Sequence, residues 1–146
     1  MKRKIQFLII FTIIFSVVKA NEPVKKNPLL GKWNLVTAKL NNKPSPPYTL
    51  NRTMEFDSVH HFIGKSTVNG KERKYNSGKY FIANDSTVIC IHEMGNGKLA
   101  PHSFTYRFQV KDQTLHLHGF YYRHVPTLSG VLKIMYIDEY WMKEEE

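Results

Sequence analysis

Two histidines on one predicted strand have the spacing that most directly suggests chemistry. His116 and His118 are separated by one residue, and alternation along a β-strand puts both imidazoles on one face, as a two-ligand metal site requires. Spacing places no third ligand beside them, and the hairpin to which they belong turns this face outward. We therefore expect neither a metal site nor a cofactor.

Cys90 and His92 form a second pattern, because a thiol beside a histidine can act as a nucleophile. Residues two apart on a strand stand about 7 Å apart at the backbone, which is too far for the hydrogen bond that activates a thiol. A buried unpaired thiol is the more common state of a lone cysteine. The sequence also has no nucleophile elbow, zinc-protease helix motif or glycine-rich phosphate loop. We predict no catalytic residues and a protein that is not an enzyme.

Basic residues form a third pattern, concentrated in four predicted loops at residues 41–50, 68–76, 95–102 and 123–130. These segments hold six basic residues and one acidic residue, a balance of +5. A positive rim above an apolar cavity would attract anionic amphiphiles, although surface lysines also simply keep a protein soluble. The candidates for binding an acidic group at this rim are Lys71, Arg73, Lys98 and Arg123, with Arg52 at the start of a strand nearby.

The element that positions most of the apolar candidates is a predicted hairpin at residues 103–122. Apolar and polar residues alternate from Phe104 to Val110 and again from Leu115, a period of two that indicates half-buried strands. Asp112-Gln113 supplies the turn, and pairing about it collects the large apolar groups on one face. The predicted opposite pairs are Val110 with Leu115, Phe108 with Leu117, and Phe104 with Tyr121.

Eight predicted strands and the lengths of their connections indicate the fold class. The strands cover residues 29–40, 52–57, 60–67, 77–83, 87–93, the two arms of the 103–122 hairpin, and 131–143. Tight turns alternate with long connections, as in an up-and-down meander, whereas a Greek-key sandwich needs long crossovers. We predict an all-β, eight-stranded antiparallel up-and-down barrel in preference to an open sandwich, because closure removes exposed sheet edges.

The interior of this barrel is predicted to hold a cavity that opens among the long loops. The inward-facing residues expected nearer this mouth are Tyr80, Phe104, Tyr106 and Tyr121, and those expected deeper are Phe108, Val110, Leu115 and Leu117. Trp33 and Trp141 should lie together at the tight-turn end, where large aromatic side chains are expected to form a structural plug.

Residues 1–20 are predicted to be a secretory signal peptide. A positive stretch at residues 1–4 precedes an apolar run at 5–18 and small residues suited to cleavage after Ala20. The apolar run is too short to span a bilayer, and no cysteine follows it for lipid attachment. We predict a periplasmic or secreted monomer, with no membrane span in the mature form and no nucleic-acid partner. Residues 21–28 would be a disordered lead, and 29–146 one domain.

Gly31-Lys32-Trp33, at the start of the first predicted strand, is similar to the Gly-x-Trp signature of lipocalins. With the Gly-x-Tyr at residues 78–80 and the closing stretch 136–141, it makes the mature chain resemble a family of small secreted bacterial lipocalin-like domains of unknown function. Glu139 and Trp141 fill the Glu-x-Trp pair of that family. The resemblance implies a calycin-type barrel and a binding role, and it brings no established catalytic residues.

These patterns predict a lipocalin-like binding protein for a small apolar or amphiphilic, anionic molecule. The alternative is a protein-interaction module whose barrel is filled by its own aromatic side chains, which the outward-facing Phe120 and Tyr122 would favour. The volume of the interior separates the two. A pocket under roughly 100 Å³ would favour the module, because ligand sites are several-fold larger.

Overall fold

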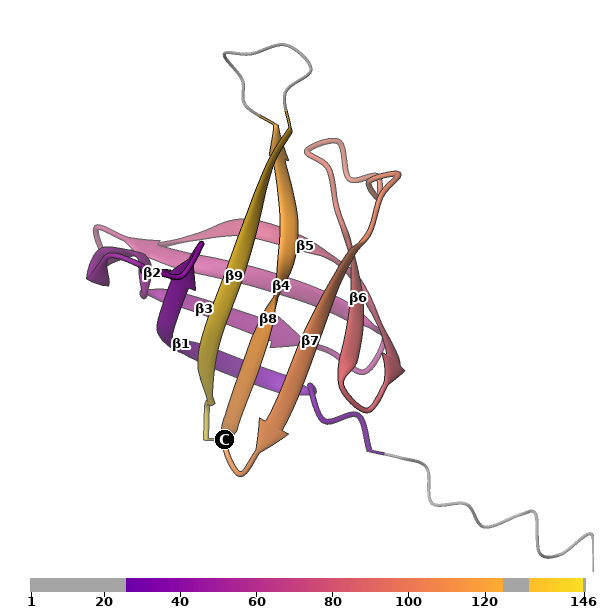
Figure 1. The fold of residues 1–146 in the computed structure, drawn as a ribbon, viewed down its shortest axis with the longest axis horizontal. Coiled ribbons are helices and arrows are strands. Elements are labelled where there is room, and N and C mark those ends of the chain that lie inside the picture. Colours follow the sequence, from indigo (N-terminus) through magenta and orange to yellow (C-terminus); the bar gives the residue numbers. More distant parts are fainter. Residues whose placement is uncertain (1–25, 125–131, 146) are drawn as a thin grey trace, which may run out of the picture.

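The computed structural model describes residues 26–124 and 132–145, so the predicted signal peptide lies outside the described residues. The described part is built from β-strands (Figure 1). They are β1 (Gly31–Leu40), β2 (Lys43–Pro44), β3 (Arg52–Phe56), β4 (His61–Val68), β5 (Lys71–Asn84), β6 (Thr87–His92), β7 (Phe104–Lys111), β8 (Thr114–His124) and β9 (Leu132–Lys143). A single 3-10 turn at Pro47–Thr49 is the helical segment of this part. No helix within the described residues has the length and apolarity needed to cross a membrane.

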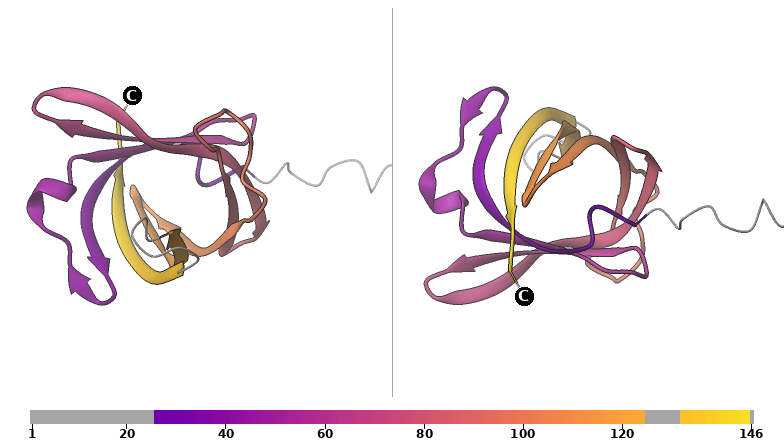
Figure 2. Two further views of the ribbon diagram at one scale, coloured as in Figure 1. Left: turned by 90° about the horizontal axis from the view of Figure 1, so that it is seen from above. Right: turned by 90° about the horizontal axis from the view of Figure 1, so that it is seen from below.

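Eight of the described strands form one closed antiparallel barrel. β1 pairs with β3, each later strand pairs with the next along the chain, and β9 pairs back with β1. The closing ladder runs from Trp33 opposite Lys143 to Leu40 opposite Ile137, and the end views show β1 and β9 side by side (Figure 2). The short strand β2 folds back onto the end of β1. The predicted eight-stranded up-and-down barrel is confirmed.

The hairpin of β7 and β8 has most of the predicted register. Val110 lies opposite Leu115 and Phe108 lies opposite Leu117. The paired register ends at Tyr106 opposite Gly119, so the predicted pairing of Phe104 with Tyr121 is not among the ladder pairs; Phe104 pairs with Cys90 of β6 instead. Gly119 allows the two strands to approach closely at this last pair, because a Cβ at Gly119 would lie 2.8 Å from the ring of Tyr106.

The three predicted tight turns are present, and each uses a residue suited to a turn. Asp57 accepts hydrogen bonds from the backbone N–H groups of Val59 (3.0 Å) and His61 (2.7 Å). Asn84 accepts one from the N–H of Ser86 at 3.0 Å, and Asp112 adopts φ +52°. These turns lie at one end of the barrel, which we call the closed end.

The connection between β4 and β5 differs from the prediction. Residues 68–76 were expected to form a long loop, but β5 begins at Lys71 and pairs with β4 as far as Val68. Asn69 and Gly70 make a two-residue turn with φ of +51° and +72°, the conformation that Asn-Gly hairpin turns favour. The basic residues of this segment therefore belong to a strand rather than to a loop over the mouth.

Large side chains fill the closed end completely. Trp33 and Trp141 lie on the paired strands β1 and β9 and are 0% and 1% exposed, so they form the predicted plug. The indole N–H of Trp33 donates to the carbonyl of Leu29 at 2.8 Å. The hydroxyl of Tyr80 donates to the carbonyl of Asp57 and accepts from the side-chain amide of Asn27, both at 2.7 Å. The segment that precedes β1 thus seals this end of the barrel.

Candidate ligand-binding cavity

The other end of the barrel is open, because its strands diverge there. In Figure 1 the β4–β5 hairpin extends to the left, whereas β8 and β9 rise to the top. A cavity of about 750 Å³, which we call the outer chamber, lies between β1, β2, the 3-10 turn and the facing ends of β4, β5, β8 and β9. The outer chamber is the mouth of the barrel.

A second cavity of about 340 Å³, which we call the inner chamber, lies inside the barrel among the inward-facing side chains of its strands. Alternation along β3, β4, β6, β7 and β8 turns one apolar side chain in every two residues toward it. Its apolar wall includes Met54, Phe56, Phe62, Val88, Phe104, Tyr106 and Leu117. Its volume is within the usual range of small-molecule sites and well above the limit set for a filled barrel.

Five residues line both chambers and so mark the boundary between them. These boundary residues are Arg52, Tyr75, Tyr121, Ile137 and Glu139. They come from β3, β5, β8 and β9, which means that the boundary is held by strands on opposite sides of the barrel. A molecule that occupies both chambers would contact them.

An ion pair stands at this boundary. Nη2 of Arg52 lies 3.1 Å from Oε1 of Glu139, and Nε of Arg52 donates to the carbonyl of Thr49 at 2.9 Å. Glu139 is 6% exposed. Burial raises the pKa of its carboxyl group, and the attraction of Arg52 opposes this shift. The buried indole N–H of Trp141, which has no hydrogen-bond partner among the described residues, adds a weaker attraction in the same direction as Arg52.

Tyr75 reaches the boundary because of an irregularity in the sheet. The register shifts between Gly64 and Lys65 of β4, so that Tyr75 is an extra residue on β5. Gly64 leaves room for its ring, since a Cβ at that position would lie 2.7 Å from Cζ of Tyr75. The guanidinium of Arg52 lies 5.7 Å from the centre of this ring, within reach of a cation–π interaction. Burial raises the pKa of Tyr75, so the phenol remains protonated at neutral pH.

The thiol of Cys90 and the imidazole of His92 line the inner chamber. Burial raises the pKa of Cys90 to about 12, which keeps the thiol protonated at neutral pH. The ring of His92 packs edge-on against Phe62 and Phe104, with centroid separations of 5.3 Å and 4.8 Å. Burial and the neighbouring His102 lower the pKa of His92. Both side chains act as parts of the wall.

The outward position predicted for His116 and His118 is confirmed. They lie opposite Gln109 and Arg107 on the outer face of the barrel. Nε2 of His116 lies 2.7 Å from Oδ1 of Asp138, and its ring stacks on that of Tyr140 at 4.2 Å. Within residues 26–124 and 132–145, no group of three or more His, Cys, Asp or Glu side chains is arranged to hold a metal ion.

The apolar and aromatic residues predicted from the sequence to bind a ligand, together with Arg52, do not all line the inner chamber. Those that line the inner chamber are Arg52, Phe104, Tyr106, Leu117 and Tyr121. Phe108 is 4% exposed within the core and lines neither chamber. The position predicted for Tyr80 near the mouth is wrong, because its bonds to Asp57 and Asn27 fix it at the closed end.

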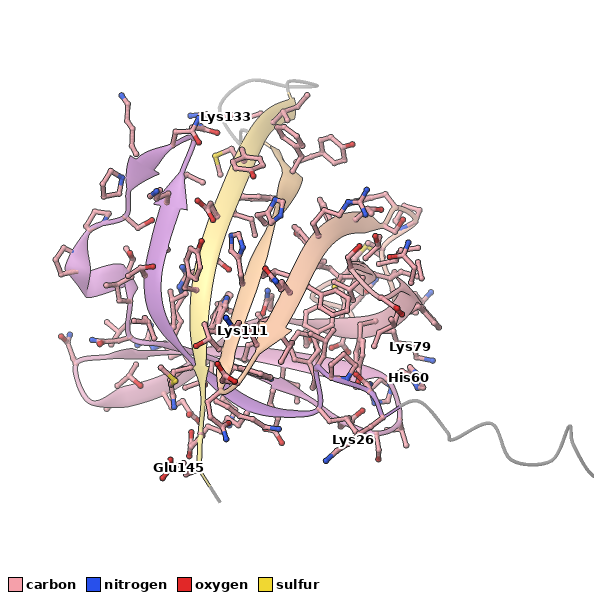
Figure 3. All side chains as sticks on the ribbon, turned by 60° about the horizontal axis from the view of Figure 1, so that its bottom comes forward. Lys26, His60, Lys79, Lys111, Lys133 and Glu145 are labelled. Carbon is pink, nitrogen blue, oxygen red and sulfur yellow. The ribbon has the colours of Figure 1, made fainter. Side chains whose placement is uncertain are left out.

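The predicted basic rim is placed differently. Lys71, Arg73 and Lys98 line neither chamber, and the side chain of Arg123 lies outside the described residues. Lys39, Lys43 and Lys133 line the outer chamber in their place. Figure 3 shows Lys133 at the end of β9 that is far from Glu145. Lys39 is also 3.9 Å from Asp138, so its charge is partly compensated.

Two residues that line both chambers, Tyr75 and Glu139, were not predicted from the sequence to be part of the site. Tyr75 was assigned to a loop, and the Asn69-Gly70 turn signal would have placed it on a strand. Glu139 was noted only as part of the Glu-x-Trp pair, because apolar residues occur on both faces of its strand. Its alternation with Trp141, Ile137 and Met135 is the signal that turns it inward.

No protein-family model matches this chain, and no curated protein sequence matches it. The site is therefore described by its own geometry.

Proposed function

We propose that this protein binds a small amphiphilic anion inside its barrel and has no catalytic activity. The observation that carries the proposal is an apolar inner chamber of about 340 Å³ that adjoins a mouth of about 750 Å³, with the guanidinium group of Arg52 lining both. An apolar wall that also presents the ion pair of Arg52 and Glu139 suits a ligand with a hydrocarbon part and a polar head, and Arg52 offers that head a positive partner. Lys43 and Lys133 at the mouth would raise the local concentration of such anions.

We also propose that the protein is secreted or periplasmic and that it is a lipocalin-like carrier, as the sequence predicts. A secreted or periplasmic lipocalin-like carrier would meet its ligand outside the cytoplasm, where sparingly soluble amphiphiles need a protein to hold them. The raised pKa of the Cys90 thiol supports a binding role over a nucleophilic one.

The test is ligand binding by two variants that make the same substitution on opposite faces of β9. Ile137 lines both chambers, whereas Ile134 is 61% exposed on the outer face. We expect Ile137→Trp to weaken the binding of the fluorescent anion 1-anilinonaphthalene-8-sulfonate at least tenfold and Ile134→Trp to leave it unchanged. Native mass spectrometry of the secreted protein would show the natural ligand. A wild-type protein that is empty and binds no such probe would overturn the proposal.

The second candidate is a protein-interaction module, and exposed apolar groups on β8 and β9 favour it. Phe120 is 59% exposed and Ile134 is 61% exposed, and their cross-strand partners are the aromatic residues Tyr136 and Tyr122. The size of the inner chamber counts against a filled barrel. Loss of a partner in the Ile134→Trp variant, with the anion still bound, would favour this candidate.

A further inference from the structure

The buried ion pair at the chamber boundary would be in contact with the acidic group of a bound anion. The inference drawn from this contact rests on the proposed function. We propose that the acidic head of a single-chain carboxylic acid binds at Arg52, and that Glu139 takes up one proton as it does so. Arg52 is then the headgroup subsite and Glu139 is the residue that links binding to pH.

The position of Arg52 suits a headgroup subsite. Its guanidinium is held by Thr49 at 2.9 Å and by Glu139 at 3.1 Å, so it is already oriented before a ligand arrives. It lines both chambers. A carboxylate beside it would leave an attached chain free to extend into the inner chamber, where the wall is apolar.

Charge balance is the reason that a proton must enter. In the free protein the guanidinium of Arg52 and the carboxylate of Glu139 sum to zero, and Glu139 is 6% exposed. A ligand carboxylate at Arg52 would put two negative groups beside one positive group in a region of low dielectric, which strongly favours the protonated form of one of them. The ligand anion, the ionised pair and one proton from solvent therefore give the ligand carboxylate, Arg52 as a cation and Glu139 as a neutral acid.

The groups around Glu139 offer no other compensation at close range. Those that face it or interact with it are Arg52 from β3, Tyr75 from β5, Tyr106 from β7, Tyr121 from β8, and Asp138 and Trp141 from β9. Among these described neighbours, Arg52 carries the positive charge. Burial raises the pKa values of Tyr75 and Tyr106, so their phenols stay neutral, and Asp138 adds a further negative charge. Lys39, Lys43 and Lys133 line the outer chamber.

The inner chamber offers an apolar space for the hydrocarbon part of such a ligand. Its volume of about 340 Å³ is near the lower end of the range found for small-molecule sites. The chemical class that fits is a medium-chain monocarboxylic acid, with its head at Arg52 and its tail among Met54, Val88 and Leu117.

The test is isothermal titration calorimetry of the full secreted protein with sodium decanoate at pH 8, in two buffers with different enthalpies of ionisation. The difference between the measured enthalpies gives the number of protons taken up per ligand. We expect a value close to one for the wild type and close to zero for Glu139→Gln, which should bind decanoate at least as tightly. 1-Decanol, which has the same chain without the acid, should bind the wild type with no proton uptake.

Each outcome decides a different point. Decanoate binding to the wild type without proton uptake would overturn this inference and leave the proposed function standing, because the protein would still bind an amphiphilic anion. Equal proton uptake by the wild type and Glu139→Gln would also overturn it. If neither decanoate nor 1-decanol binds the wild type, the proposed function fails and this inference fails with it. The wild-type buffer comparison remains decisive even if the variant folds poorly.

Discussion

The closed end and the open end of this barrel are built from the same strands but are filled in different ways. At the closed end the inward residues Trp33, Trp141 and Tyr80 are almost fully buried against one another. The segment before β1 adds Leu29, which is 0% exposed. At the open end the inward residues face two chambers, and an ion pair lies between them.

This difference shows that alternation alone does not decide whether a barrel is filled. The same period of two turns Trp33 and Glu139 inward. What differs is that the chain segment before β1 lies across the closed end, where Leu29 and Asn27 form hydrogen bonds with Trp33 and Tyr80. Stability is therefore expected to depend mainly on the closed end, whereas binding is expected to depend mainly on the open end.

The largest expected effect is that of Trp33→Ala at the closed end. Removing a fully buried indole loses apolar contacts and leaves a cavity, which costs about 3 to 5 kcal/mol of unfolding free energy. Urea denaturation followed by circular dichroism would measure the loss. Tyr121→Ala is the matched change at the open end, and it should cost less than half as much because Tyr121 already borders both chambers. Equal losses would contradict the division of roles.

The next effect concerns the ion pair and its dependence on pH. Arg52→Met leaves the buried Glu139 without its cation and should cost about 3 kcal/mol at pH 8. The folded-state pKa of Glu139 is raised above the ordinary value of 4.5, so its contribution to stability is present below that value and is lost as pH rises through the raised pKa. The deficit of Arg52→Met should therefore shrink when unfolding is measured at pH 5.

The control for this prediction is the double variant Arg52→Met/Glu139→Gln. It removes the charge along with its partner and should recover most of the stability that Arg52→Met loses at pH 8. A deficit that is the same at both pH values, or that persists in the double variant, would mean that Arg52 stabilises the barrel by packing rather than by charge.

A smaller effect is expected for Tyr80→Phe, which keeps the ring and removes the hydroxyl. That hydroxyl joins Asp57 to Asn27 at the closed end. Its loss leaves a carbonyl and an amide without this partner, which should cost about 1 kcal/mol. Thermal unfolding would measure the change. Anion binding by this variant should equal that of the wild type, and weakened binding would show that the closed end also shapes the cavity.

The smallest perturbation is a chemical probe of Cys90, which requires no mutation. Burial raises the pKa of its thiol from 9.0 to about 12, so the native thiolate fraction falls about a thousandfold. The reaction of the native protein with a disulfide reagent at pH 8 should be slower than that of the urea-unfolded protein by at least this factor. A fast native reaction would show that the inner chamber is wet and freely accessible.

Much of the fold could be predicted from sequence because alternation and turn residues report on local structure. The register of β7 with β8 follows from the turn at Asp112-Gln113 together with the alternation of Phe108, Val110, Leu115 and Leu117. Residues 68–76 do not form a long loop because the Asn69-Gly70 turn reverses the chain within two residues and lets the polar residues after it pair with β4.

The cavity was less predictable because it depends on contacts between distant strands. Arg52 and Glu139 are 87 residues apart and come together only when β9 closes the barrel near β3. Tyr80 has the inward alternation of a cavity residue, but its hydroxyl partners at the closed end decide its position. Phe104, Tyr106, Leu117 and Tyr121 were identified because one hairpin holds them all.

The most direct test of the central claim is to measure intermolecular nuclear Overhauser effects between the isotope-labelled protein and unlabelled decanoate. The arrangement with the head at Arg52 predicts contacts from the terminal methyl group of the ligand to the methyl groups of Met54, Val88 and Leu117, which line or face the inner chamber. Contacts confined to outer-face residues such as Ile134, or a ligand reversed with its tail at the mouth, would contradict it.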